Sequence, residues 1–259
     1  MIRQHGSNPP VFFKNTEHAG LAGQLARHFG NHHFELPPIP QEVFIDLAYH
    51  HDDGWQAIDD NPPLNDEGLP FDLQETPTRY LFATINESPA INEKRHPLAG
   101  LLDSMHLYGI YTGRFGLTDP IDWGHYSIDE QRQLRACLNQ ELERQNRLKA
   151  QLAGTPCVYD HYLMYAYKLL QFLDMLALYF NCRTPGMRGA QIFEHVPCHT
   201  DEDVCVTIHE LESGAYRLIP FPFHAFPLEL SCQGMRMIKA RHSKGCQSEI
   251  FAEHYTLLA

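Results

Sequence analysis

The sequence has no apolar run that suggests a membrane span, no excess of positive charge and no paired set of cysteines. Its most apolar stretch, residues 163–180, is interrupted by Lys168, Gln171 and Asp174, and the first residues form no charged-then-apolar signal. The 259 residues include 20 basic and 32 acidic side chains, a formal net charge of −12, which excludes a large nucleic-acid footprint. The cysteines are scattered and odd in number, so we expect reduced thiols in a cytoplasmic protein without a membrane partner.

What the sequence does contain is a helical first part and a strand-like last part. Hydrophobic residues make up 43% of the chain, enough for a large core. Helix caps and apolar periodicity predict helices at 15–29, 40–50, 77–86, 97–111, 127–152 and 160–182. Short apolar segments predict strands at 11–13, 204–211, 215–219, 228–231, 235–239 and 249–257. We therefore predict an α+β fold, with an all-helical bundle core at residues 1–185 and a small C-terminal antiparallel β appendage at 186–259 packed on it.

The stretch His51-Asp52-Asp53-Gly54-Trp55 organises the rest of the chain. It closes the helix predicted at 40–50, on which Phe44, Leu47 and Ala48 share one face, and His51 is the next position on that face. Gly54 is placed where a helix ends. An imidazole beside a carboxylate at the inner end of a buried helix is costly to desolvate without partners, and a cation is one arrangement that satisfies both.

Three other helices turn a ligand-type side chain inward. His18 shares a face with Leu25 and Phe29, and His106 lies on the apolar stripe of the helix at 97–111. Asp174 points into the core from the middle of the most apolar helix, where an unpaired carboxylate is strongly unfavourable. A lone inward histidine is more often a hydrogen-bonded core residue than a ligand, so the convergence carries the prediction. Nitrogen and carboxylate ligands together suit Fe, Mn, Ni, Zn or Co, and carboxylates with water also suit Mg.

The long segment 55–76 follows directly on the motif and contains several proline and glycine residues. A loop of this length in a compact domain is often functional, so we predict a cover for a substrate, with Trp55 as its anchor. Basic side chains that could hold a phosphate flank the predicted helices at Arg79, Lys94, Arg95 and Arg114, and nothing in the sequence singles one out.

The order His18, His51-Asp52, Asp174 on successive helices resembles the HD-domain superfamily of metal-dependent phosphohydrolases, whose His-Asp-x-Gly sequence matches residues 51–54. The stretches 17–22, 51–55, 104–106, 170–174, 220–223 and 227–230 look closer still to an uncharacterised family within or beside that superfamily, whose members carry the same motif at residues 51–55. The likeness extends over nearly the whole chain. It implies an HD-like helical core that binds one or two divalent metal ions.

By this resemblance, His18, His51, Asp52 and Asp174 would hold the first metal, and Asp52 would bridge to a second one. His106 matches an extra histidine of two-metal relatives, and His96 or His125 would supply its companion. Asp53 would orient a ligand or a water molecule, which makes Asp52 and Asp53 the candidate catalytic residues. His50 and Gln171 are expected to support the ligands from outside the coordination sphere. The function implied is hydrolysis of a small phosphorylated molecule through a metal-activated water, and an oligomer is compatible with it.

Two other functions are compatible with the same residues. Myo-inositol oxygenase and its phosphonate-cleaving relatives are HD-like and carry two irons, and His18, His51-Asp52, His96, His106 and Asp174 fit their ligand order. The third reading is a protein that has lost catalysis and binds a ligand or partner through its sheet. A competing zinc site would use residues from a cluster near the start of the sheet region: His195, Cys198, His199, Cys205 and His209.

Overall fold

A computed structural model describes residues 1–239 and 246–259 of the chain. Along the chain, two short strands come first, the helices follow, and the remaining strands come last. The α-helices are α1 (Asn15–His28), α2 (Gln41–His50), α3 (Gln56–Asp60), α4 (Thr78–Arg95), α5 (Pro97–Thr112), α6 (Ile128–Gln151) and α7 (Asp160–Asn181). The strands are β1 (Ile2–Gln4), β2 (Val11–Phe13), β3 (Gln191–His199), β4 (Glu202–Glu210), β5 (Tyr216–Ile219), β6 (Leu228–Lys239) and β7 (Cys246–Leu258).

The sheet is the feature that the sequence prediction has wrong. Among the described residues the strands join in one curled seven-stranded sheet in the order β1-β2-β6-β7-β5-β4-β3, a half-barrel in a mixed α/β fold. The sheet takes β1 and β2 from the N-terminus, where β2 pairs with β6 through Val11 and Arg236, and β5 pairs with β7 in parallel. An all-helical core with a small antiparallel appendage is therefore incorrect.

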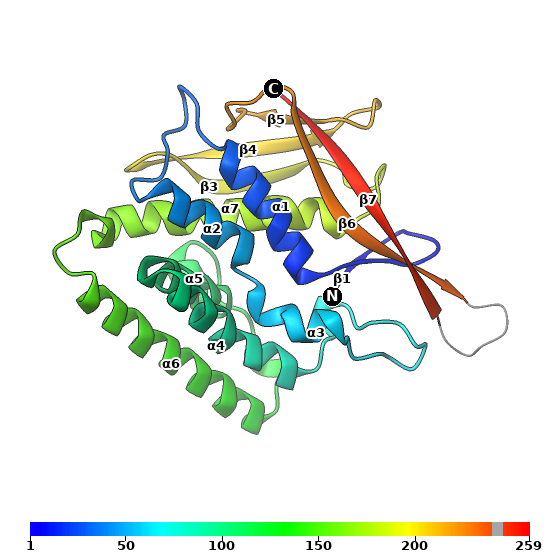
Figure 1. Cartoon of the computed structure of the whole chain (residues 1–259), viewed down its shortest axis with the longest axis horizontal. Helices are drawn as coiled ribbons and strands as arrows, with labels where there is room; N and C mark the ends of the chain where they lie inside the picture. The colour runs from blue at the N-terminus through cyan, green and yellow to red at the C-terminus, as the bar shows by residue number, and fades with distance from the viewer. Residues whose placement is uncertain (240–245) are drawn as a thin grey trace.

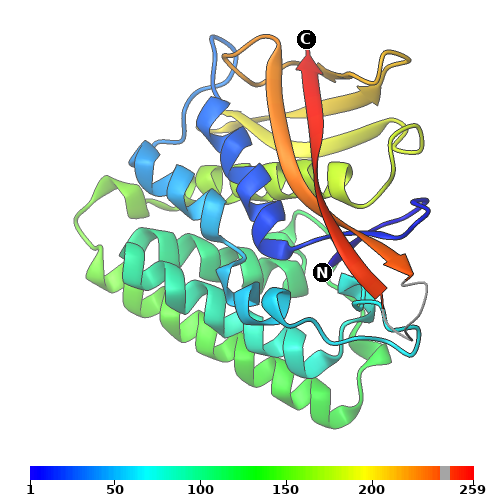
Figure 2. The same cartoon turned by 45° about the vertical axis from the view of Figure 1, so that its right-hand side comes forward.

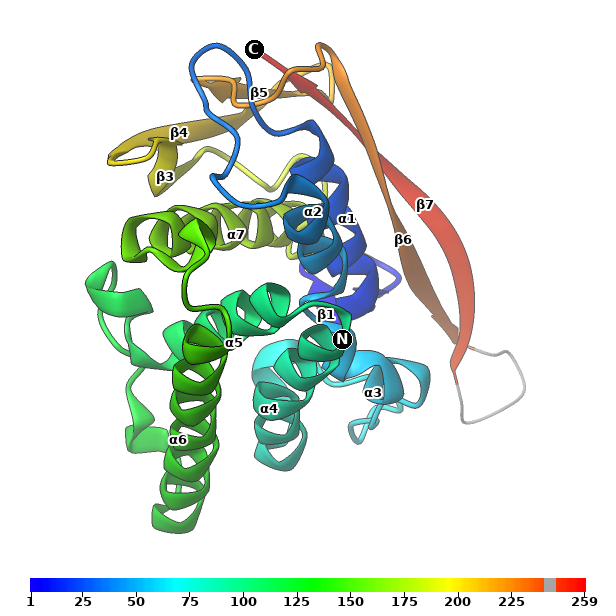
Figure 3. The same ribbon diagram turned by 60° about the vertical axis from the view of Figure 1, so that its left-hand side comes forward.

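The helices form two layers beside this sheet (Figures 1 and 3). The inner layer is α1, α2 and α7, with α1 against β6 and α7 against β3, and the outer layer is α4, α5 and α6. Figure 2 shows β6 and β7 running as a long twisted ribbon past α1 towards the N-terminus. One apolar core joins Leu25 of α1 and Phe180 of α7 to Leu218 of β5 and Leu257 of β7. The division at residue 185 stays a prediction.

Most helix limits follow local signals. The capping box at the start of α6 is present, because Ser127 Oγ accepts from the Glu130 backbone N–H while Glu130 accepts from that of Ser127. α4 is longer than predicted, because it continues through Pro89 to Arg95 although proline disfavours a helix interior. No helix that the structure describes combines the length and the apolar character needed to span a bilayer.

Candidate metal centre

Four helices bring the predicted ligand residues to one place. His18 comes from α1, His51 follows the last residue of α2, and Asp174 comes from the middle of α7. His18 Nε2 lies 2.8 Å from Asp174 Oδ1, and His51 Nε2 lies 3.8 Å from the same oxygen and 3.7 Å from Asp52 Oδ2. His106 Nε2, from α5, lies 3.9 Å from Asp174 Oδ2. Ligand atoms of His18, His51 and Asp52 all lie within 4.8 Å of one another, a spacing that one metal ion can bridge.

Two imidazole rings are oriented by the backbone and by an amide behind them. His51 Nδ1 lies 3.0 Å from the Ala48 carbonyl oxygen, and His18 Nδ1 lies 3.1 Å from Asn181 Oδ1. If each Nδ1–H donates to its oxygen, each Nε2 presents a lone pair to the carboxylates, which is the arrangement found behind metal-bound histidines. His51 Nε2 is buried and has no hydrogen-bond partner among the described residues. A lone pair that faces carboxylates in the interior needs a cation or a proton between them.

Burial and neighbouring charges shift the pKa values of the histidines and carboxylates in this cluster. Burial lowers the pKa of His51, but the carboxylates of Asp52 and Asp174 outweigh it and raise this pKa to about 10. Burial raises the pKa of Asp52, whereas the three histidines around Asp174 hold its pKa well below the usual value despite burial. Burial lowers the pKa of His106 to about 3, so His106 is neutral and able to offer a lone pair.

Gln171 supports His106 from the preceding turn of α7. Its Nε2 contacts His106 Nδ1, and its Oε1 is buried without a hydrogen-bond partner. A half-turn of the amide exchanges the two atoms, so that Oε1 accepts from Nδ1–H and His106 Nε2 faces the cluster as an acceptor. Gln171 therefore contacts His106 from outside the group of His18, His51, Asp52 and Asp174.

The other predicted site residues lie away from the cluster. Asp53 accepts from Arg95 Nη2 at 2.9 Å and is paired with His50 Nδ1 at 3.1 Å, on the outer side of the motif. His50 also faces Asp46 at 3.5 Å. His96 caps α5, where its Nδ1 accepts from the Leu98 backbone N–H, and it does not line the cavity described below.

Helix α4 holds the motif in place through hydrogen bonds to its backbone. Asn92 Nδ2 donates to the His50 carbonyl at 2.8 Å, and Ser88 Oγ accepts from the Gly54 backbone N–H at 2.9 Å. A Cβ atom on Gly54 would lie 2.7 Å from the Ser88 backbone nitrogen. Glycine is thus required at position 54 by this close approach. Gly54 has no positive φ, so it does not adopt the left-handed conformation typical of a glycine that ends a helix.

The cluster opens into a cavity of about 540 Å³. His18, Asp52, His106 and Asp174 lie at its polar end, and most of the rest of its lining is apolar or aromatic. The predicted cover contributes Trp55, Leu73 and Gln74 to the wall. Two further polar groups on the wall are His125, one of the two predicted companions of His106, and Arg114. The cavity can hold a small organic molecule next to the carboxylates.

The competing histidine and cysteine group forms only in part. Cys198, His199 and Glu202, at the turn between β3 and β4, have ligand atoms within 4.8 Å of one another. His199 Nδ1 instead pairs with Glu35 at 3.1 Å and Cys198 Sγ donates to the Glu202 carbonyl at 3.3 Å. These local partners account for the group without a metal.

Sequence reasoning missed Asn181, which lies two turns after Asp174 on the same face of α7. Its side-chain oxygen lies within hydrogen-bond distance of His18 Nδ1, and its Nδ2 donates to Cys232 Sγ of β6 at 3.6 Å. The sheet therefore supports the orientation of His18. Its position seven residues after Asp174 in an otherwise apolar helix is a sequence signal that could have found it.

The fold and the site together define a mixed α/β protein with a buried histidine–carboxylate cluster at the end of an apolar cavity. Residues 1–239 match the model of the family described as "Protein of unknown function (DUF3891)", and the chain belongs to this family. No curated protein and no solved structure matches the chain.

Proposed function

We propose that the chain is a metal-dependent hydrolase of HD type that acts on a small phosphorylated molecule. The observation that carries this proposal is the buried His51 Nε2, which has no hydrogen-bond partner in the described part of the chain and faces two carboxylates. The order His18, His51-Asp52, Asp174 along the chain supports it through the resemblance to HD phosphohydrolases. The donor set of imidazole nitrogens and carboxylate oxygens fits a divalent transition-metal ion.

His18, His51, Asp52 and Asp174 would hold the ion, with His106 beside them. When bound, such an ion polarises a phosphoryl oxygen and brings the pKa of a coordinated water close to neutrality. Asp52 lies on the cavity wall, where its carboxylate can accept a proton from an attacking water molecule. The mostly apolar lining lowers the local dielectric constant and so strengthens the electrostatic interactions of the cluster.

Metal analysis tests the proposal directly. Protein purified without added metal is analysed for Fe, Mn, Ni, Zn, Co and Mg, alongside His51→Ala, Asp174→Ala and the control His50→Ala. We expect near-stoichiometric metal in the parent and in His50→Ala, because His50 pairs with Asp46 and Asp53 outside the cluster, and loss of metal in the other two variants.

Activity on p-nitrophenyl phosphate with added Mn²⁺ or Mg²⁺ should follow the same pattern. Bound iron with an oxygen-dependent spectrum and no phosphatase activity would favour the oxygenase in place of the hydrolase. Metal that survives in both His51→Ala and Asp174→Ala would remove the basis of either enzyme and leave a ligand-binding protein.

A further inference from the structure

The turn after α5 has a backbone conformation that ordinary residues rarely adopt. Four consecutive residues, Gly113, Arg114, Phe115 and Gly116, have φ values of 83°, 51°, 57° and 88°. Two of them are not glycine, and a left-handed conformation brings their Cβ atoms too close to the following carbonyl oxygens. Strain of this kind persists where the surroundings hold it, and such places are often functional.

The surroundings do hold this turn. The backbone N–H groups of Gly116 and Thr118 both donate to the Gly113 carbonyl, at 2.9 and 3.1 Å. A Cβ atom at position 113 would lie 2.5 Å from the Thr118 carbonyl oxygen, so glycine is required there. The Phe115 ring packs edge-on against Tyr167 of α7, with centroids 5.1 Å apart. Together these contacts set the direction in which Arg114 leaves the backbone.

The Arg114 side chain lines the cavity and has no acidic partner among the described residues. It is the only arginine or lysine among the described residues that line the large cavity, and it also lines a smaller one of about 180 Å³ beside β3. Its Nη2 lies 3.3 Å from Met175 Sδ, next in sequence to Asp174, and no carboxylate of the described chain lies within ion-pair distance. By contrast, Arg144 and Arg188 both form ion pairs with glutamates. An unpaired guanidinium on a cavity wall is a site for an anion.

The remaining wall restricts which anion fits. Ile85, Ile110, Tyr111, Ile121 and Tyr126 are among the apolar and aromatic residues that line the cavity. One guanidinium and one metal site can balance a single phosphate, whereas a di- or triphosphate brings further negative charge next to Asp52 and Asp174 in a chain of net charge −12.

We propose, on the basis of the hydrolase function above, that Arg114 binds the phosphate of a monophosphate ester whose organic part is apolar or aromatic. The guanidinium holds two phosphate oxygens, and the organic group lies along the apolar wall. Nucleoside triphosphates and other polyphosphates are then poor ligands.

Binding and turnover are measured separately to test this. Calorimetry with Mn²⁺-loaded protein uses phenyl phosphate, inorganic phosphate and ATP as probes, with the parent, Arg114→Gln, Arg114→Lys and the control Arg132→Gln. Arg132 is an exposed residue of α6 that does not line the cavity. We expect Arg114→Gln to weaken phenyl phosphate binding about ten- to hundredfold, Arg114→Lys to weaken it less, and the control to be unchanged. In the parent, phenyl phosphate should bind more tightly than inorganic phosphate or ATP.

Other outcomes would overturn the role of Arg114, the substrate class or the hydrolase function. Equal affinity of the parent and Arg114→Gln for phenyl phosphate overturns the role of Arg114, and tighter binding of ATP or inorganic phosphate overturns the substrate class. If the parent hydrolyses p-nitrophenyl phosphate while Arg114→Gln keeps an unchanged KM, the hydrolase stands and this inference fails. If phenyl phosphate binds through Arg114 but no phosphate ester is hydrolysed, the inference stands and the hydrolase fails.

Discussion

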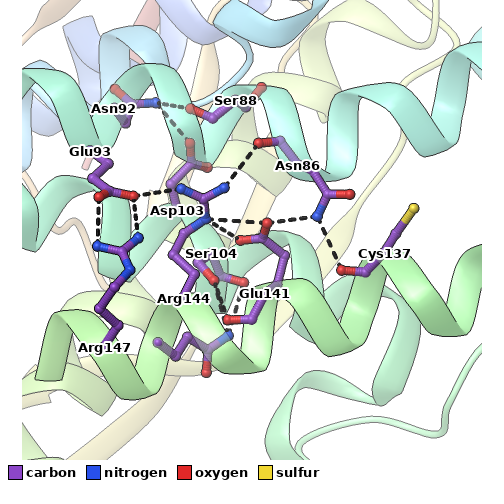
Figure 4. A network of polar contacts seen from close by, with 11 residues as sticks. Asn86, Ser88, Asn92, Glu93, Asp103, Ser104, Cys137, Glu141, Arg144 and Arg147 are labelled. Atoms are coloured by element: carbon purple, nitrogen blue, oxygen red, sulfur yellow. Dashed lines mark hydrogen bonds and ion pairs between the residues drawn. The ribbon is translucent and has the colours of Figure 1, made fainter.

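Two buried polar clusters lie on neighbouring helices, and only one of them is complete. Between α4, α5 and α6, the fully buried Glu141 accepts from Arg144 Nε at 3.0 Å and from Asn86 Nδ2 at 2.7 Å. Glu93 accepts from Arg144 and Arg147, and these arginines hold the pKa of Glu93 below its usual value (Figure 4). Two carboxylates meet two guanidinium groups, so every charge in this network has an opposite partner.

The histidine–carboxylate cluster lacks such a balance. Asp52 and Asp174 face imidazole nitrogens, one of which has no hydrogen-bond partner, and neither carboxylate forms an ion pair with an arginine or lysine within the described residues. A closed polar network thus serves the fold, whereas a buried group that still needs a positive charge points to something bound.

The largest expected effect comes from breaking the complete network. Arg144→Met leaves the buried Glu141 without its guanidinium, and we expect a loss of about 3–5 kcal/mol in the free energy of unfolding. Arg147→Met, which removes an exposed partner of Glu93, should cost about 1 kcal/mol or less. Urea denaturation at neutral pH measures both. Similar losses for the two variants would show that the network is not the structural unit described here.

The protonation of His51 gives a pH test on metal-free protein. In the folded state the pKa of His51 is raised to about 10, against roughly 6.5 in the unfolded chain. The stability from this proton is therefore fully present below about pH 6.5 and is lost as the pH rises to about 10. We expect a decrease of the order of 4 kcal/mol across this window in the parent and a much smaller one in His51→Gln. A parent curve that stays flat between pH 6.5 and 10 would contradict the charge assigned to the cluster.

Metal should replace that proton. Because the folded cluster binds an ion that the unfolded chain does not, free metal at one hundred times its Kd adds about 2.7 kcal/mol of stability. Thermal unfolding of chelator-treated parent with and without Mn²⁺ or Zn²⁺ shows this gain, and Asp174→Asn should not show it. His50→Gln serves as the control and should respond like the parent. An equal gain in Asp174→Asn would locate the ion elsewhere.

The smallest effect concerns Asp103, which lies beside the complete network. Its Oδ2 accepts from Asn92 Nδ2 at 2.7 Å, its Oδ1 and Asn92 Oδ1 both lack partners, and burial raises the pKa of Asp103 well above its usual value. A raised carboxyl pKa means that stability falls as the pH rises above roughly 4. Asp103→Asn removes this penalty and can donate to Asn92 Oδ1, so we expect a gain of about 1 kcal/mol at pH 8.

Urea denaturation of the Asp103→Asn variant at pH 4 and pH 8 checks the prediction. The gain should shrink at pH 4, where Asp103 is protonated in the folded protein and the unfolded chain is no longer mostly ionised. A variant less stable than the parent at both pH values would mean that the Asp103 carboxyl group contributes a favourable contact.

Helical periodicity explains why much of the candidate site could be predicted. His18, His51, His106 and Asp174 each lie on an apolar face, and such faces must turn to a common interior, so their meeting follows from the pattern of single helices. The partners of these residues were harder to predict, because Asn181 and the Ala48 carbonyl act through orientation and not through residue type. Arg114 could not be chosen among the basic residues, since its direction depends on a left-handed turn that its own side chain disfavours.

The sheet was missed for a related reason. β1 is three residues long, too short for an alternating pattern to be visible, and among the described strands it pairs only with β2. A strand is predicted at β2, but its other partner, β6, lies more than 200 residues away in the chain. β6 was read as two strands because Gly234 interrupts the apolar pattern. In the structure a Cβ atom at Gly234 would lie 2.7 Å from the Phe251 ring, so glycine makes room for an aromatic side chain inside a continuous strand.

The sequence by itself determined most of the helices, though not α3 or the second half of α4, together with their buried faces and the residue types that those faces carry. Each of these depends on neighbours within a few turns. Only the tertiary structure decided that both ends of the chain share one sheet, that His51 keeps an unpaired nitrogen, and that Arg114 alone among the basic residues lines the large cavity in the described chain. These features depend on contacts between distant segments, and the free energy of such contacts is not encoded in any local pattern of residues.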